Sequence, residues 1–233
     1  MPIFGRTRTY TLVVPPDYAA SSSWPLVFVL HGHGGSGSQV RAAFDLEGAA
    51  RGRALFVYPD AARGGWDLDA PASKNPDVAL FDAILAVTQS SYCVDLRRVF
   101  VTGFSNGAYM ANQLACRRGD LVRAVASHSG GGPYETTGEY DAQGNLVCNG
   151  KPVASLVVHG ASDGTVAPSE GQKSIDHWTH ANHCAGSTAT SPAPCITFQG
   201  CSNPVVTCKV PALGHSIWPQ ARPLVWSFFE AQR

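Results

Sequence analysis

The stretch V-F-V-T-G-F-S-N-G-A-Y-M (residues 99–110) carries the main signal for the fold and a candidate for its chemistry. Its first four residues are β-branched or aromatic, which predicts a buried strand, and helix-forming residues begin at Ala108. Between them, residues 103–107 match G-x-S-x-G, in which a serine occupies a sharp turn between a strand and a helix. We therefore predict that Ser105 is a nucleophile. The alternative is a serine that only caps the helix after a tight turn.

Residues 160–164 match the same pattern around Ser162. An apolar strand precedes this second match, but Thr165-Val166-Ala167-Pro168 follows it. Proline and β-branched residues argue against an immediate helix, so this context does not predict a nucleophile.

Outward from this stretch, apolar strand patterns alternate with helical ones along the whole chain. This alternation predicts one α/β domain over residues 1–233, with a mostly parallel central sheet and helices on both faces. Polar, glycine-rich and cysteine-bearing segments at 130–150 and 184–204 interrupt the rhythm, and we expect them to shape a binding site. The expected strands are 10–14, 26–30, 54–58, 99–102, 122–127, 153–159 and 205–210; the expected helices are 38–51, 77–91, 108–117, 170–181 and 223–231.

A carboxylate stands where this fold places the acid of a catalytic triad. Asp163 follows the apolar strand 155–159 by a few residues, and the chain order in such sheets is serine, acid, histidine. An aspartate before Gly164 is also a common turn former. Glu170 and Asp176 are weaker candidates because they lie in or near the next helix, further from the strand end.

His215 is the best candidate for the general base among the eight histidines. It lies just beyond the last strand and before the last helix, where the final triad member belongs, although a surface loop histidine would fit too. His177, His180 and His183 recur every three residues, but this spacing drifts around a helix and no acidic cluster joins it. We expect these three on a solvated helix surface and predict no metal.

The glycine-rich loop His31–Gly35 follows a buried strand and leaves backbone N–H groups free. We expect the N–H groups of His33 and Asn106 to face a developing oxyanion. A phosphate loop is the alternative, but the lysine of a P-loop is missing. Trp66 and Trp218 lie in expected rim loops, and binding of a flat substrate ring and packing in the core are equally good interpretations for both.

Composition excludes some partners and favours export. Lys plus Arg equals Asp plus Glu, 17 each, so no overall charge attracts nucleic acid or an anionic membrane. No apolar run is long enough to span a bilayer, and the N-terminus lacks an apolar signal core. A neutral or polymeric substrate fits this charge balance better than a polyanion.

Seven cysteines in a chain without C-x-x-C pairs indicate disulfides formed in an oxidising compartment. We therefore expect a secreted protein whose leader has been removed. Because seven is odd, at least one thiol is left over. If 195–199 and 205–210 form a hairpin, Cys195 would lie near Cys208 and leave Cys184–Cys201 as a second pair.

The chain resembles carbohydrate esterase family 1, which includes feruloyl and acetyl xylan esterases, and the related poly(3-hydroxybutyrate) depolymerases. The matching residues are L-H-G-H-G-G at 30–35, Y-P-D at 58–60, C-V-D-L-R-R-V-F-V-T-G-F-S-N-G-A-Y-M at 93–110, H-G-A-S-D at 159–163 and G-H-S-I-W-P at 214–219. The resemblance implies an extracellular α/β-hydrolase without cofactor, with Ser105, Asp163 and His215 as its triad. It also implies disulfides.

We therefore expect a serine esterase that acts on feruloyl or acetyl esters of plant cell-wall polysaccharide. We also expect it to be a monomer whose partner is a small-molecule or oligosaccharide ester. Cleavage of a hydroxybutyrate polyester or its oligomers is the alternative within enzymes. A non-catalytic binding protein with a hydrolase fold is the alternative outside them.

Overall fold

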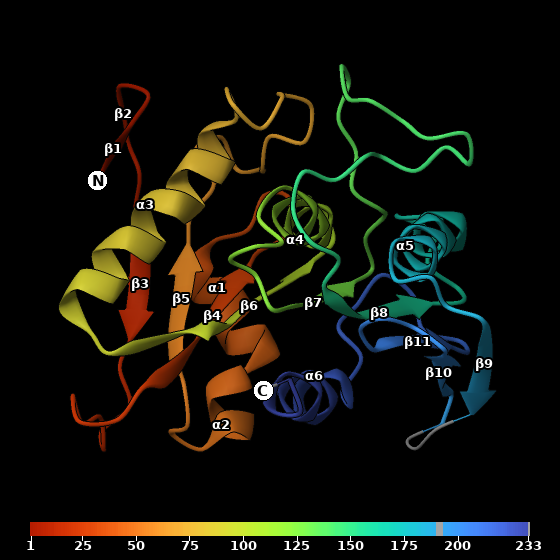
Figure 1. Cartoon of the computed structure of the whole chain (residues 1–233). Helices are drawn as coiled ribbons and strands as arrows, with labels where there is room; N and C mark the ends of the chain where they lie inside the picture. The colour runs from red at the N-terminus through yellow and green to blue at the C-terminus, as the bar shows by residue number, and fades with distance from the viewer. Residues whose placement is uncertain (190–192, 233) are drawn as a thin grey trace.

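The computed structural model describes residues 1–189 and 193–232. Within these residues nine strands form one sheet in the order β3-β5-β4-β6-β7-β8-β11-β10-β9, and a β1–β2 hairpin stands apart (Figure 1). The inner strands pair in parallel from β5 to β11, whereas β3, β10 and β9 pair antiparallel with their neighbours. The strands are β1 (Pro2–Ile3), β2 (Arg6–Thr7), β3 (Tyr10–Val13), β4 (Trp24–Leu30), β5 (Leu55–Pro59), β6 (Val94–Phe104), β7 (Ala124–His128), β8 (Ala154–Gly160), β9 (Gly186–Ala189), β10 (Cys195–Gln199) and β11 (Val205–Val210).

Helices cover both faces of the sheet, as Figure 1 shows. Alternating side chains of β4 illustrate why: Phe28 and Leu30 belong to one core cluster, Val27 and Val29 to the other. Helices α3 (Pro76–Ser91), α4 (Asn106–Arg117) and α5 (Pro168–Ala181) complete the first cluster, and α1 (Gly37–Phe44), α2 (Leu46–Ala50) and α6 (Ala221–Glu230) complete the second. Burial of each such side chain stabilises the fold by about 1.5–3 kcal/mol.

This architecture confirms the predicted fold class. Most of the predicted elements differ from the observed ones by at most two residues at each end, and three differences are larger. The expected helix 38–51 is broken at Asp45, whose left-handed backbone (φ 43°) separates α1 from α2. Strand β6 begins at Val94, five residues earlier than predicted, because it continues through charged, exposed positions. The segment 184–204 contains β9 and β10, which extend the sheet at its edge.

Three disulfides close loops of the chain. Cys184–Cys201 and Cys195–Cys208 confirm the two predicted pairs, and Cys195 and Cys208 face each other across the β10–β11 ladder. The third, Cys116–Cys148, joins the end of α4 to the segment 130–150 and was not predicted. Cys93 is the unpaired thiol. In the described ranges, no helix has the length and apolar character needed to cross a bilayer.

The parallel strands bring the candidate site residues to one edge of the sheet. Strands β4, β6, β7 and β8 end at Leu30, Phe104, His128 and Gly160, and the loop after β11 contains His215. Because parallel strands share their direction, the loops that follow them lie side by side.

Removal of the Cys116–Cys148 disulfide should destabilise the protein by about 3–4 kcal/mol, because the bond closes a long loop (sequence separation 32) in the unfolded chain. The variant is Cys116→Ala/Cys148→Ala, and denaturant unfolding gives its free energy. The matched control Cys93→Ala should change stability by less than about 1 kcal/mol. Equal stability of the double variant and the wild type would contradict this role.

Candidate active site

Ser105 lies on a strained turn between β6 and α4. Its backbone has φ 55° and ψ −122°, outside the conformations that side chains favour, and its N–H donates to the carbonyl of His128 (2.9 Å). The two flanking glycines are sterically required. A Cβ at Gly103 would lie 2.2 Å from the carbonyl oxygen of Gly107, and one at Gly107 would lie 2.4 Å from that of Leu30.

The structure brings Ser105, His215 and Asp163 into one hydrogen-bonded line. The Nε2 of His215 lies 3.0 Å from the Oγ of Ser105, and its Nδ1 lies 2.8 Å from the Oδ2 of Asp163. Because a carboxylate only accepts, Nδ1 carries the proton in this arrangement and Nε2 is free to accept from the hydroxyl. An imidazole oriented in this way can act as a general base toward Ser105.

Asp163 remains a carboxylate although its side chain is fully buried. Burial alone would raise its pKa, but the hydrogen bond from His215 and the amides of Val166 and Thr165 (both 2.9 Å) outweigh it and hold the pKa below its ordinary value. The N–H of Ser162 donates to the carbonyl of Leu213 (3.0 Å), which ties the acid loop to the histidine loop. Ser162 itself is exposed and outside the line.

A second histidine, His128, fixes the loop that carries His215. Its buried ring accepts a hydrogen bond at Nε2 from the N–H of Trp218 (2.9 Å), and Nδ1 lies 3.1 Å from the Oγ of Ser129. Burial, followed by the neighbouring His159 and His215, lowers the pKa of His128 to about 3. The ring is therefore neutral and can accept from Trp218. The predicted site did not include His128, although its place just after an apolar strand pattern was an available signal.

The glycine-rich loop lies against Ser105. A Cβ at Gly32 would lie 3.3 Å from the Cβ of Ser105, so the backbone approaches the serine closely. The indole of Trp66 donates to the carbonyl of His31 (2.7 Å), and the N–H of Trp66 donates to the side chain of Asn106 (2.6 Å). The loop bearing the expected His33 donor, the Trp66 loop and Asn106 thus form one network.

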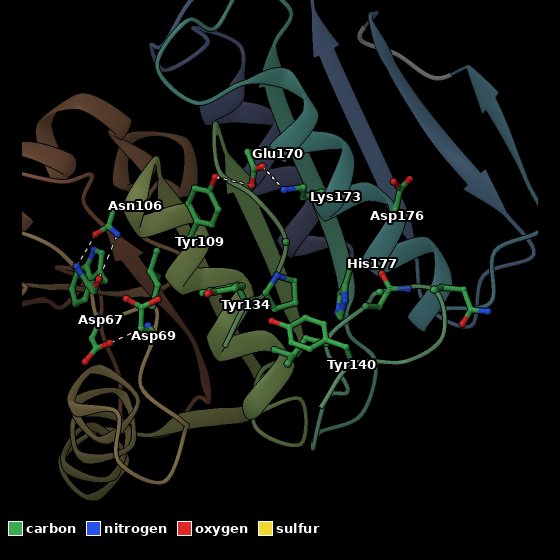
Figure 2. Close-up of a pocket in the computed structure, with 18 residues that line it drawn as sticks. Asp67, Asp69, Asn106, Tyr109, Tyr134, Tyr140, Glu170, Lys173, Asp176 and His177 are labelled. Carbon is green, nitrogen blue, oxygen red and sulfur yellow. Dashed lines mark hydrogen bonds and ion pairs between the residues drawn. The ribbon is translucent and has the colours of Figure 1, made fainter. Parts of the chain in front are cut away.

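A pocket of about 810 Å³ opens beside Asn106 and reaches α5 (Figure 2). Both tryptophans pack in the core, the second of the two interpretations left open for them. Trp66 is 5% exposed and belongs to the first core cluster, although it also lines the pocket, and Trp218 is 7% exposed and packs with α6. Glu170 and Asp176, the weaker candidates for the acid of the triad, also line this pocket. Neither pairs with His215, which is hydrogen-bonded to Asp163.

The prediction that His177 lies on a solvated helix surface is wrong, because its side chain is only 4% exposed. Its Nε2 lies 3.4 Å from the Sγ of Cys148, and the segment 130–150 covers it. Burial, together with His180, lowers the pKa of His177 to about 4. His180 and His183 are exposed, as expected.

Comparisons with known proteins agree on one group of enzymes. The chain is 33% identical over 210 residues to a probable feruloyl esterase C of Aspergillus niger, covering 85% of this chain and 73% of that protein. It is 31% identical over 244 residues to feruloyl esterase C of Emericella nidulans, covering 96% and 84%. No family model matches the sequence.

Solved structures share the fold at lower sequence identity. An acetyl xylan esterase from Aspergillus awamori superposes with a TM-score of 0.75 at 19% identity, covering 94% of this chain and 93% of that one. A ferulic acid esterase from Anaeromyces mucronatus, in complex with ferulic acid, gives 0.61 at 18% identity, covering 97% and 85%. The architecture is the α/β-hydrolase fold.

His128→Gln should weaken the dependence of stability on acid pH. Folded His128 stays neutral down to about pH 3, while the unfolded ring takes up a proton below the ordinary histidine pKa of 6.5. Its contribution is thus present above about pH 6.5 and is lost as pH falls toward 3, with a slope of up to about 1.4 kcal/mol per pH unit. Denaturant unfolding between pH 7 and 4 measures this slope. The exposed control His183→Gln should keep the wild-type slope; an unchanged slope in His128→Gln would refute the assignment.

Proposed function

Because this chain belongs to the feruloyl esterase family, we propose that it hydrolyses carboxylic esters through an acyl-enzyme on Ser105. The proposed substrates are feruloyl or acetyl esters of plant cell-wall polysaccharide. The observation that carries this proposal is the continuous line from the Asp163 carboxylate through His215 to the Ser105 hydroxyl.

In the proposed reaction, His215 accepts the proton of Ser105 while its Oγ attacks the ester carbonyl. Asp163 stabilises the imidazolium that forms. The N–H groups of His33 and Asn106 donate to the oxyanion, each with an effect of about 3–4 kcal/mol on the barrier. The tetrahedral intermediate then expels the alcohol, which takes the proton from His215. Water, activated by the same imidazole, releases the acid and restores Ser105.

This chemistry needs neither a metal nor an organic cofactor, since the chain's own residues supply the nucleophile, base and oxyanion donors. Trp66 is proposed as a substrate-binding residue through the small part of its ring that lines the pocket, since the rest of the side chain packs in the core. We further propose that the chain acts as a secreted, monomeric catalytic domain. The three disulfides support export, because such bonds persist in oxidising compartments.

Ser105→Ala should lower kcat/KM for methyl ferulate by about 10⁴–10⁶-fold, because it removes the nucleophile and leaves the fold intact. The second G-x-S-x-G match supplies a matched control: Ser162→Ala should keep wild-type activity within about twofold, since Ser162 is exposed and outside the hydrogen-bonded line. Full activity of Ser105→Ala would end the proposal.

Two further measurements test the class of function. A fluorophosphonate should label Ser105 covalently in the wild-type protein, whereas a binding protein without catalysis would show neither adduct nor esterase activity. Methyl ferulate should be cleaved faster than short hydroxybutyrate oligomers. The reverse order would favour the polyester reaction.

A further inference from the structure

The pocket beside Asn106 is lined by an excess of negative charge. Asp67, Asp69, Glu170 and Asp176 line it, and Lys173, the one lysine or arginine among the described lining residues, pairs with Glu170 (2.5 Å). His177 adds no positive charge near neutral pH, because burial, first of all, lowers its pKa to about 4. The pocket is therefore anionic overall.

Three of these carboxylates keep acceptor capacity for a ligand. One oxygen of Asp67 accepts from the N–H of Ala70 (3.0 Å), one of Asp69 from Thr136 (3.3 Å), and one of Asp176 from Gln172 (2.6 Å). Over the described ranges, the other oxygen of each has no hydrogen-bond partner within the protein. A ligand rich in hydroxyl donors fits such a lining.

Two exposed aromatic rings lie on the same walls. Tyr134 and Tyr140 are 46% and 40% exposed, and Figure 2 shows both between Asn106 and His177. Aromatic rings offer flat apolar faces to the C–H faces of a sugar. Carboxylate acceptors beside accessible rings therefore suit a polyhydroxylated ring better than an alkyl chain.

The wall that carries these tyrosines is held in place by α4. The side chain of Gln113 donates to the carbonyl of Tyr134, and Arg117 pairs with Glu135. The hydroxyl of Tyr140 donates to the carbonyl of Glu135 (3.0 Å) and accepts from its N–H (3.1 Å). The Cys116–Cys148 disulfide closes the far end of the segment. The wall is thus formed before substrate arrives, which lowers the entropy lost on binding.

We propose that this pocket binds the alcohol side of the ester as an uncharged oligosaccharide, with its rings against Tyr134 and Tyr140 and its hydroxyls donating to Asp67, Asp69 and Asp176. The inference rests on the proposed function. The acyl side is a poorer occupant because a feruloyl group offers a single hydroxyl donor and an acetyl group offers none, whereas a sugar ring offers several. The alcohol leaves as a neutral sugar.

A binding experiment tests the assignment without catalysis. Calorimetry on Ser105→Ala should show xylotriose bound at least about tenfold more tightly than trigalacturonate, because three added carboxylates meet an anionic pocket. The double substitution Asp69→Asn/Asp176→Asn in the Ser105→Ala protein removes two negative charges, so the difference in affinity between xylotriose and trigalacturonate should become smaller. Equal or tighter binding of trigalacturonate, or no binding of xylotriose, would overturn the proposal.

Kinetics locate the sugar relative to the reacting ester. With a feruloylated arabinoxylotriose, Tyr134→Ala should raise KM about three- to tenfold, the effect of losing one ring contact, and leave kcat unchanged. With methyl ferulate, which has no sugar, both parameters should stay within twofold. Tyr134→Phe should keep the wild-type KM for the feruloylated oligosaccharide because the ring remains. Leu96 is exposed but lies outside the pocket, so Leu96→Ala should change neither KM nor kcat for either substrate.

An equal rise of KM for both substrates in Tyr134→Ala would instead place the acyl group in this pocket. An unchanged KM for both substrates would show that Tyr134 does not contact the substrate. Either outcome would overturn the proposal. Failure of the proposed function is distinguishable. The wild-type protein would then cleave neither ester, while calorimetric binding of xylotriose would still support the sugar pocket.

Discussion

The backbone turn at Ser105 is the constraint on which the site depends. A non-glycine residue in such a conformation costs of the order of 1–3 kcal/mol and persists only where its surroundings fix it. Here the parallel strands β4 and β7 flank β6, and the N–H of Ser105 is bound by the carbonyl of His128. The close approach of Gly107 to Leu30 leaves no room for a side chain. The central sheet therefore sets the position of the hydroxyl.

The other loops are positioned relative to that turn by a few hydrogen bonds that join them to one another. His128, at the end of β7, accepts from the N–H of Trp218, which lies three residues after His215. The N–H of Ser162 donates to the carbonyl of Leu213, two residues before His215. Each of these bonds holds a backbone group of the His215 loop at the edge of the sheet, and one of them is accepted by the side chain of His128. The geometry of the imidazole therefore depends both on strand order and on this one neighbouring residue.

Much of this arrangement could be predicted because its signals are local. A strand, a G-x-S-x-G turn and a helix follow one another in sequence, and Asp163 and His215 each follow a strand end. The break at Asp45 is marked only weakly: no proline stands there, and Asp45 caps α2 by accepting from the N–H of Gly48 (3.3 Å) within what reads as one helix. The burial of His177 could not be predicted either, because it depends on a segment some 30 residues earlier in the chain. Cys148 of that segment lies against the His177 ring and is joined to α4 by a disulfide. Contacts of this kind depend on the path of an irregular segment, which periodicity does not describe.

Helix α4 joins two tasks at its opposite ends. Its first residue, Asn106, follows Ser105, while three residues in its second half hold the tyrosine-bearing segment: Gln113, Cys116 and Arg117. Its 12 residues span about 18 Å. Cys116 and Arg117 lie at the end of α4 that is far from the strained turn, so the part of the segment beyond Tyr134 can accept substitutions, insertions or deletions over evolutionary time with little disturbance of Ser105. Gly130 is different, because a Cβ there would lie 2.5 Å from the Cβ of Ala108 in the first turn of α4. Divergence of substrate preference within such a lineage would then concentrate in one short stretch of the gene.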